Sequence, residues 1–161
     1  MGYNMVFYVD GGCRHNGSGY AIGAAAAVKM KRNRGHVYWT EKMDFDDSPT
    51  NQRAEMLAII LALPSALSEY DTLNPLPYLF LEIRSDSKYA IGCMTEWKAR
   101  WICNGWRNSR GNDVANTDLI RQAYDLEDRV KDIGKVTYTH IPRAQNTVAD
   151  GYCNQAMDEM E

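Results

Sequence analysis

The sequence contains no apolar run long enough to cross a membrane, because a spanning helix needs about 20 consecutive apolar residues. Its first residues also lack the basic stretch and apolar segment of a secretory signal. The four cysteines form no CxxC pair and no Cys/His cluster with the spacing of zinc ligands. We therefore expect free thiols, no membrane partner, and a reducing location inside the cell, cytoplasmic or nuclear.

The sequence also lacks repeats, low-complexity tracts and linker-like segments. Its 161 residues, 45% of them hydrophobic, are enough for one core and too few for two ordinary domains. We expect a single domain over residues 1–161, and a monomer, because no additional apolar stripe is evident. The net charge of −3 argues against a protein coated by nucleic acid, since non-specific phosphate binding relies on Lys and Arg.

One segment departs from this acidic average. Residues 97–112 contain no Asp or Glu and interleave basic with aromatic side chains, namely Lys98, Arg100, Arg107 and Arg110 with Trp97, Trp101 and Trp106. Another acid-free basic stretch, 29–34, lies between two expected strands, where a solvated hairpin is favoured over a nuclear-import signal. The acidic average is therefore compatible with a local nucleic-acid contact in residues 97–112.

Three strands are expected first, over residues 3–9, 20–30 and 37–45. Their short connections predict an antiparallel meander. Residues 50–63 are apolar on nearly all sides, which is typical of a helix buried in the core, and Pro64 is expected to weaken or end it. The continuous apolar run 78–83 then predicts a strand in parallel pairing, covered on both faces.

The second half of the chain completes this pattern. A helix is expected after Ser85-Asp86-Ser87, another over residues 120–130, a fifth strand over 136–141, and a last helix after Asn146. The order β-β-β-α-β-α-α-β-α predicts an α/β fold with a five-stranded mixed sheet, three antiparallel strands and then two parallel, flanked by helices.

Four carboxylates stand where these strands end or helices begin: Asp10 in VDGG, Glu55 in TNQRAE, Asp86 in SDS and Asp150 in NTVAD. Taken singly, Asp10 could be a turn residue, Asp86 a helix N-cap and Asp150 a surface acid. Glu55 requires a partner in its apolar helix, either an arginine or a bound cation.

The expected sheet brings these acids together, because a parallel strand that follows a crossover is placed beside the first strand. Carboxylates that converge repel one another and raise each other's pKa unless cations neutralise them. An oxygen-only ligand set suits Mg²⁺ or Mn²⁺ rather than zinc. Two such ions about 3.5 to 4 Å apart can activate a water and stabilise a leaving oxygen at a phosphodiester.

Together the four strings resemble the catalytic domain of a type 1 ribonuclease H, over residues 5–157. The resemblance implies the ribonuclease H-like fold and hydrolysis of the RNA strand of RNA/DNA hybrids, leaving 5′-phosphate and 3′-hydroxyl ends. It implies that the four acids hold two Mg²⁺ ions, with Mn²⁺ as a possible substitute. His140 resembles the family residue assigned to proton handling or product release, although it could instead be a hydrogen-bonded histidine at a strand end.

The same resemblance implies substrate contacts. Asn16, Asn51 and Gln52 match positions that contact the RNA ribose and minor-groove edges, near Cys13, although such amides are also common turn residues. Further matches are Thr50 and Asn116 for a DNA phosphate, and Trp101 and Ser109 for the DNA backbone. Ser48 stands where a basic residue often joins the phosphate pocket, so hybrid affinity is expected to be weaker. Asn116 could instead cap a helix, and Trp97 and Trp106 are expected mainly to pack.

Two other interpretations compete with this enzyme. A non-catalytic ribonuclease H-like module could bind nucleic acid or a protein, but loss of an acid usually marks such modules and all four acids are present. A related nuclease could cut duplex RNA or DNA, but the amide set suits a ribose. We expect no N-terminal hybrid-binding domain, because the chain enters its first strand by Tyr3.

Overall fold

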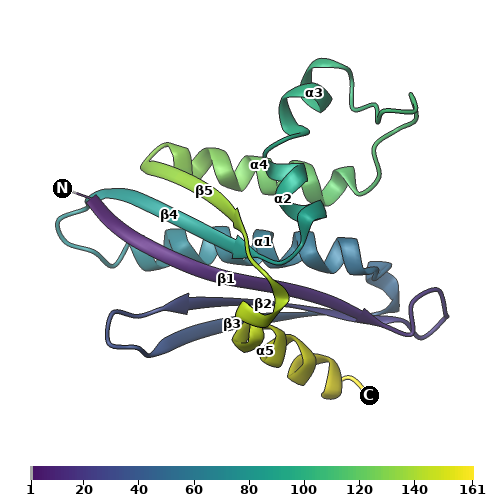
Figure 1. Ribbon diagram of the computed structural model, residues 1–161, viewed down its shortest axis with the longest axis horizontal. Helices are drawn as coiled ribbons and strands as arrows, with labels where there is room; N and C mark the ends of the chain where they lie inside the picture. Colours follow the sequence, from purple (N-terminus) through teal and green to yellow (C-terminus); the bar gives the residue numbers. More distant parts are fainter. Residues whose placement is uncertain (1) are drawn as a thin grey trace.

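A computed structural model of the protein describes residues 2–161. Its centre is a five-stranded sheet in the order β3-β2-β1-β4-β5 (Figure 1). The strands are β1 (Gly2–Arg14), β2 (Ile22–Met30), β3 (His36–Met43), β4 (Tyr78–Ser85) and β5 (Gly134–His140). The first three pair antiparallel, and β1, β4 and β5 pair in parallel. The predicted mixed sheet is therefore confirmed.

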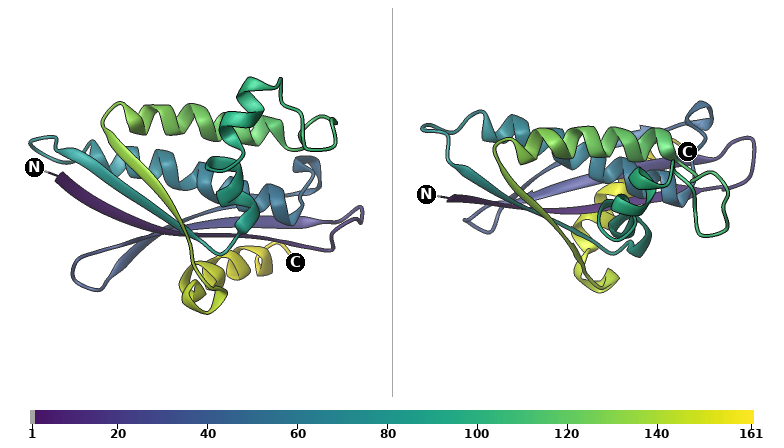
Figure 2. Two further views of the ribbon diagram at one scale, coloured as in Figure 1. Left: turned by 45° about the horizontal axis from the view of Figure 1, so that its top comes forward. Right: turned by 90° about the horizontal axis from the view of Figure 1, so that it is seen from above.

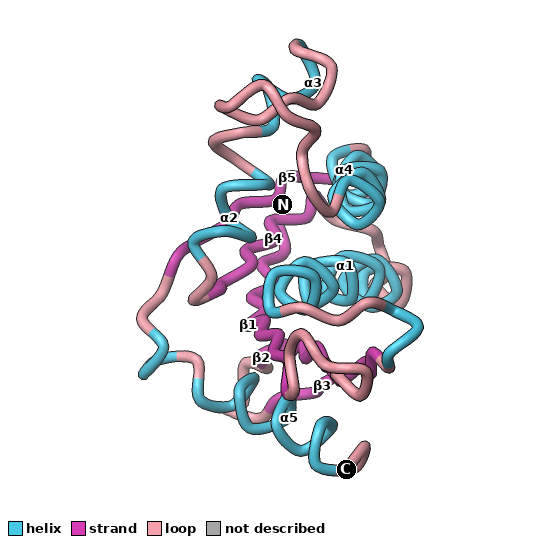
Figure 3. Tube along the Cα trace, turned by 90° about the vertical axis from the view of Figure 1, so that its right-hand side faces the viewer, coloured by secondary structure: helices cyan, strands magenta, loops and turns pink. Residues whose placement is uncertain are grey.

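Helices cover both faces of the sheet. They are α1 (Asn51–Tyr70), α2 (Lys88–Met94), α3 (Lys98–Cys103), α4 (Thr117–Lys131) and α5 (Thr147–Asp158), with short 3-10 turns η1 (Phe45–Asp47) and η2 (Arg143–Gln145). Figures 2 and 3 show α1 and α4 side by side on one face and α5 on the other. Among residues 2–161, no helix is long and apolar enough to span a membrane.

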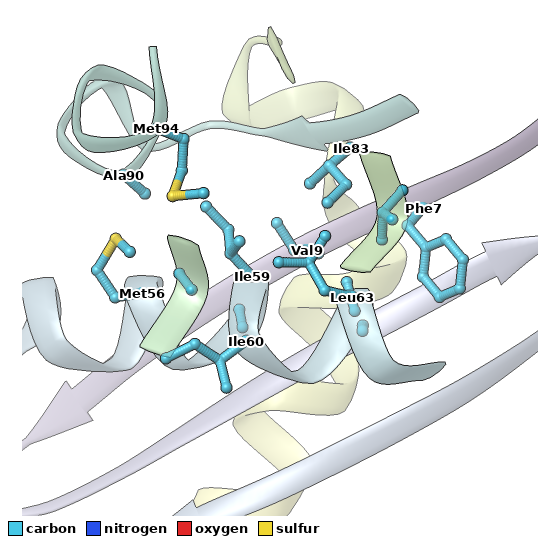
Figure 4. Close-up of a cluster of buried hydrophobic side chains, with 14 of the residues drawn as sticks. Phe7, Val9, Met56, Ile59, Ile60, Leu63, Ile83, Ala90 and Met94 are labelled. Atoms are coloured by element: carbon cyan, nitrogen blue, oxygen red, sulfur yellow. The ribbon is translucent and has the colours of Figure 1, made fainter. Parts of the chain in front are cut away.

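The main core lies between the sheet and α1 (Figure 4). Alternate β1 residues such as Phe7 and Val9 point to this face, where they meet Ile59 and Leu63 of α1. Each of these side chains is fully buried, and burial of one such side chain contributes about 1.5 to 3 kcal/mol. The opposite face of β2 packs its alanines against Cys153, Ala156 and Met157 of α5. Small residues in β2 therefore let two helices approach one strand.

Helix α1 is longer than predicted. It continues through Pro64 to Tyr70 instead of weakening or ending at the proline. Proline removes one backbone donor, but the turns beyond it bury Ala66 and Tyr70, and the Tyr70 hydroxyl donates to the Pro77 carbonyl at 2.7 Å. Packing beyond the proline therefore outweighs the lost hydrogen bond.

Strand β1 and the tryptophan-rich segment also differ from the prediction. Strand β1 runs on to Arg14, because residues 10–14 stay paired with β2, so Asp10 lies inside a strand and not in a turn. The tryptophan-rich segment contains the additional helix α3, which the sequence pattern did not indicate. This short helix projects away from the sheet with the loop that follows it (Figure 1).

Candidate active site

Asp10 and Asp86 are adjacent because of the strand register. The parallel pairing of β1 with β4 ends at Val9 and Ser85; Asp10 is the next residue of β1, and Asp86 directly follows the end of β4. Both side chains are largely shielded from solvent, that of Asp86 being 11% exposed. Ser87, and not Asp86, caps α2, since its side chain accepts from the Ala90 amide. Asp86 therefore remains free for chemistry.

Glu55 reaches the same place from the second turn of α1. Strand β1 lies against this helix at Gly11, where an added Cβ would come within 2.2 Å of the Ala54 backbone, so any larger residue would push strand and helix apart. The Ser87 hydroxyl donates to Glu55 at 2.7 Å. Burial raises the pKa of Glu55, the Ser87 hydrogen bond opposes this, and the charge of Asp86 adds to it. Glu55 and Asp86 are therefore close enough for their charges to interact.

Asp150 comes from the first turn of α5. Asn146, just before this helix, is almost fully buried and donates its side-chain amide to the Val9 carbonyl at 2.8 Å. The Asp150 amide in turn donates to the Asn146 carbonyl at 3.1 Å. Asn146 thus fixes the start of α5 to the residue that precedes Asp10. The side chain of Asp150 is exposed, as a surface acid would be, yet it faces Asp10.

The raised pKa of Asp10 reflects its burial and the closeness of Asp86 and Asp150. The pKa of Asp10 is raised from 3.8 to about 8, mainly by burial and then by the charge of Asp86 and by the hydrogen bond and charge of Asp150. A bound cation would relieve this repulsion, and the oxygen-only donor set suits a hard divalent ion. Within residues 2–161, no three acidic, His or Cys side chains already form a ligand group for one ion.

Arg143 is a member of this site that the sequence analysis missed. It lies in η2, and its Nε is 3.9 Å from an Asp86 oxygen. The guanidinium is 89% exposed, and its charge lowers the pKa of Glu55. The only sequence signal was a basic residue three positions after His140. His140 itself is exposed at the end of β5, opposite Ser85 in the register, and so lies near Asp86.

The predicted ribose-contact residues lie at the end of β1, in the turn that follows it and at the start of α1. The Asn51 side chain accepts from the Cys13 amide at 3.0 Å, which joins the end of β1 to the start of α1. Gln52 is exposed on the first turn of α1, and Asn16 is exposed in the turn between β1 and β2. Asn16 and Gln52 are therefore exposed, whereas Asn51 and Cys13 are bonded to each other.

Thr50 and Asn116 are linked through Arg53. The Thr50 side chain accepts from the Arg53 amide at 3.1 Å, and the Arg53 guanidinium donates to the Asn116 side chain at 3.4 Å. Asn116 precedes α4 but its side chain makes no capping bond, and it donates instead to Tyr89 at 2.9 Å. Arg53 also forms a bidentate pair with Asp118, at 3.0 and 2.8 Å. The predicted phosphate pocket therefore contains a cation, Arg53, whose charge is already partly neutralised by Asp118.

The tryptophan-rich segment forms a continuous row of neighbouring aromatic rings. Ring centroids of Trp97 and Trp101 are 5.6 Å apart, those of Trp101 and Trp106 6.1 Å, and Trp106 continues to Tyr124 at 5.7 Å. Trp101 is 7% exposed, more buried than its two neighbours, so packing is a main role for it as well. It still lines a cavity of about 290 Å³ with Ser109 and Arg100, which leaves its edge available to a ligand.

Comparisons with known proteins agree with this geometry. A family model described as RNase H matches residues 3–159. A curated ribonuclease H from Alcanivorax borkumensis is 32% identical, covering 98% of this chain and 94% of the relative. One from Francisella tularensis subsp. novicida is 29% identical, covering 97% and 92%.

Solved structures share the fold. RNase H1 from Halobacterium salinarum superimposes with a TM-score of 0.67 at 24% identity, covering 98% of this chain and 99% of that one. The foamy viral protease-reverse transcriptase in complex with an RNA/DNA hybrid gives 0.73 at 19% identity, covering 94% of this chain and 20% of that one. Since the family model spans nearly the whole chain and a relative shares about a third of its residues, the protein belongs to the ribonuclease H family.

Proposed function

We propose that this ribonuclease H is a metal-dependent endonuclease that hydrolyses the RNA strand of RNA/DNA hybrids and leaves 5′-phosphate and 3′-hydroxyl ends. The observation that carries the proposal is the group of acids around Asp10. The pKa of Asp10 near 8 is typical of a functional site, and such a group of acids favours the binding of a cation. Family membership supplies the reaction class, since ribonucleases H act with divalent metal ions.

Asp10, Glu55, Asp86 and Asp150 would hold the metal. Two Mg²⁺ ions, for which Mn²⁺ could substitute, would supply activation of a water and stabilisation of the leaving oxygen. The chain's own groups position the reaction: Ser87 orients Glu55, and Asn146 fixes Asp150 relative to Asp10. We assign His140, exposed near Asp86, to proton handling or product release.

Substrate selection would use the amides at the end of β1 and the start of α1. A 2′-hydroxyl both donates and accepts hydrogen bonds, and so do the side chains of Asn16, Asn51 and Gln52. We assign Cys13 to the same contact with the RNA strand. Thr50 and Asn116 would receive a DNA phosphate, with Trp101 and Ser109 at the DNA backbone. Residues 1–161 would form one catalytic domain, which would act as a monomer inside the cell.

The test is cleavage of an end-labelled RNA/DNA hybrid with Mg²⁺, beside duplex RNA, duplex DNA and single-stranded RNA of the same sequence. We expect cutting of the hybrid's RNA strand alone, and products that a kinase cannot label at the 5′ end without prior dephosphorylation. Equal cutting of duplex RNA would contradict the substrate assignment. Hybrid binding without any cleavage would contradict the catalytic one.

Ser48→Arg is expected to tighten hybrid binding. It would add a cation beside Thr50, where Arg53 is already paired with Asp118. One further phosphate contact should lower the hybrid Kd roughly 3- to 10-fold at low salt and steepen its salt dependence. Fluorescence anisotropy over a salt series measures this, with Ser48→Gln as the uncharged control. An equal gain in the Gln variant would show that charge is not the cause.

The metal-free protein should become less stable as pH rises from about 4 to 8. Asp10 has a raised pKa, so the folded state holds a proton that the unfolded state has already lost over this interval. Asp10→Asn should therefore raise the Tm in EDTA at pH 8 and change it little near pH 4. Thermal unfolding across this range measures the effect. A Tm gain that is the same at both pH values would contradict it.

A further inference from the structure

A cluster of ion pairs outside the carboxylate site joins the turn after β1 to the last residues of the chain. Arg14 donates to Asp158 at 2.7 Å and to Glu161 at 2.9 Å, and the His15 ring contacts the other oxygen of Glu161. Arg14 also donates to the side chain of Asn154 at 3.2 Å. We call Arg14, His15, Asp158 and Glu161 the α5 clasp.

His15, a member of the clasp, has a left-handed backbone conformation. Its φ is +58°, in the left-handed region that a glycine adopts freely and a residue with a Cβ adopts at a cost. The ring of His15 lies between two contacts, Glu161 and the Tyr20 ring at 5.1 Å. Such a conformation persists only where surrounding contacts impose it, and it concentrates at functional sites.

This conformation sets the direction of the turn that carries Asn16. The His15 carbonyl accepts from the Ser18 amide at 3.1 Å and from the Ser18 hydroxyl at 2.6 Å. Asn16 and Gly17 occupy the two central positions, and Gly17 has the φ of +82° that such a turn requires. The carbonyl of His15 therefore anchors the loop on which Asn16 is presented.

We propose that the α5 clasp is a positioning device for Asn16. By holding His15 in its left-handed conformation, Asp158 and Glu161 place the Asn16 amide for contact with the RNA strand. The clasp thereby sets the KM for the hybrid and leaves the chemical step to the carboxylates. This inference rests on the proposed function for its kinetic readout.

The test compares two charge-neutralised variants of the same helix end. Asp158→Asn with Glu161→Gln removes the clasp acids, whereas Glu159→Gln removes an acid that pairs with Lys42 and does not touch the turn. The clasp variant should raise the hybrid KM about fivefold to tenfold, with kcat within about twofold of wild type. Glu159→Gln should leave both constants unchanged.

Adding His15→Gly to the clasp variant should restore the KM, because glycine adopts the left-handed conformation without support. If the clasp acids only stabilised the fold, His15→Gly would not restore the KM. An unchanged KM, or failure of the rescue, would overturn the proposal. A KM that falls in the clasp variant would also overturn it, since the acids would then be competing with nucleic-acid phosphates for Arg14 and His15.

A second readout does not depend on activity. Amide hydrogen exchange of residues 15–18 should accelerate in the clasp variant and return toward the wild-type rate after His15→Gly. If the wild-type protein cleaved no hybrid, the proposed function would fail while this exchange pattern still tested the clasp. Unaltered exchange in the clasp variant would overturn the inference by itself.

Discussion

Asp10→Asn is expected to lower kcat for hybrid cleavage by about 1,000-fold or more, because a carboxylate that neutralises a metal ion contributes several kcal/mol to transition-state stabilisation. Asp10 interacts with both Asp86 and Asp150, so its loss would remove the centre of the proposed ligand group. Asparagine keeps the shape and one oxygen, so the fold should be retained. Single-turnover cleavage at saturating Mg²⁺ isolates this effect from substrate binding.

Asp125→Asn provides the matched control. Asp125 is exposed on α4, away from the site, and its neutralisation should change kcat by less than about twofold. Hybrid affinity of the Asp10 variant should match or exceed that of wild type, since a negative charge facing the phosphates has been removed. Wild-type cleavage by Asp10→Asn would refute the assignment of the carboxylates.

The second large effect is on stability. Glu127→Ala is expected to lower the free energy of unfolding by about 3 to 5 kcal/mol, because it leaves a partly buried cation without its partner. Glu127 is 2% exposed and accepts from Tyr138 at 2.7 Å, from Lys131 at 3.1 Å and from Lys98. These groups come from β5, α4 and α3, so one carboxylate joins three elements.

The pH dependence of this contribution follows from the pKa of Glu127. Burial alone would raise that pKa, but the hydrogen bonds from Lys98, Tyr138 and Lys131 outweigh it and lower the pKa. The stabilisation is therefore present at neutral pH and lost as pH falls through the lowered value. Urea unfolding at pH 7 measures the loss, with Asp125→Ala on the same helix as the control. A loss below about 1 kcal/mol would mean that the network is not coupled.

The layout of the sheet could be predicted because apolar patterning and turn chemistry are local signals. The alanine-rich strand β2 is instructive, since its composition favours a helix. It forms a strand because helices pack on both of its faces, and only small residues fit there. The length of α1 could not be predicted, because the contacts that carry it past Pro64 involve Tyr70 and Pro77, which become neighbours only in the fold.

The candidate site, like the fold, could be predicted only where the signal lies in a short stretch of sequence. The acids could be proposed from four short strings, and the strand register then brings Asp10 beside Asp86. Arg143 and Asn146 could not be assigned, because their roles depend on where η2 and the start of α5 meet β1 and β4. The burial of Trp101 was missed for a related reason, since the additional helix α3 turns it toward the core.

In the proposed site, acids from the ends of two strands and from two helices hold divalent metal around Asp10. The most direct measurement is anomalous diffraction from a crystal of the protein with an RNA/DNA hybrid and Mn²⁺. We expect two peaks about 3.5 to 4 Å apart, with Asp10 contacting both and the other three acids completing the ligand set. Ordered hybrid without a peak at Asp10, or peaks held by other residues, would contradict it.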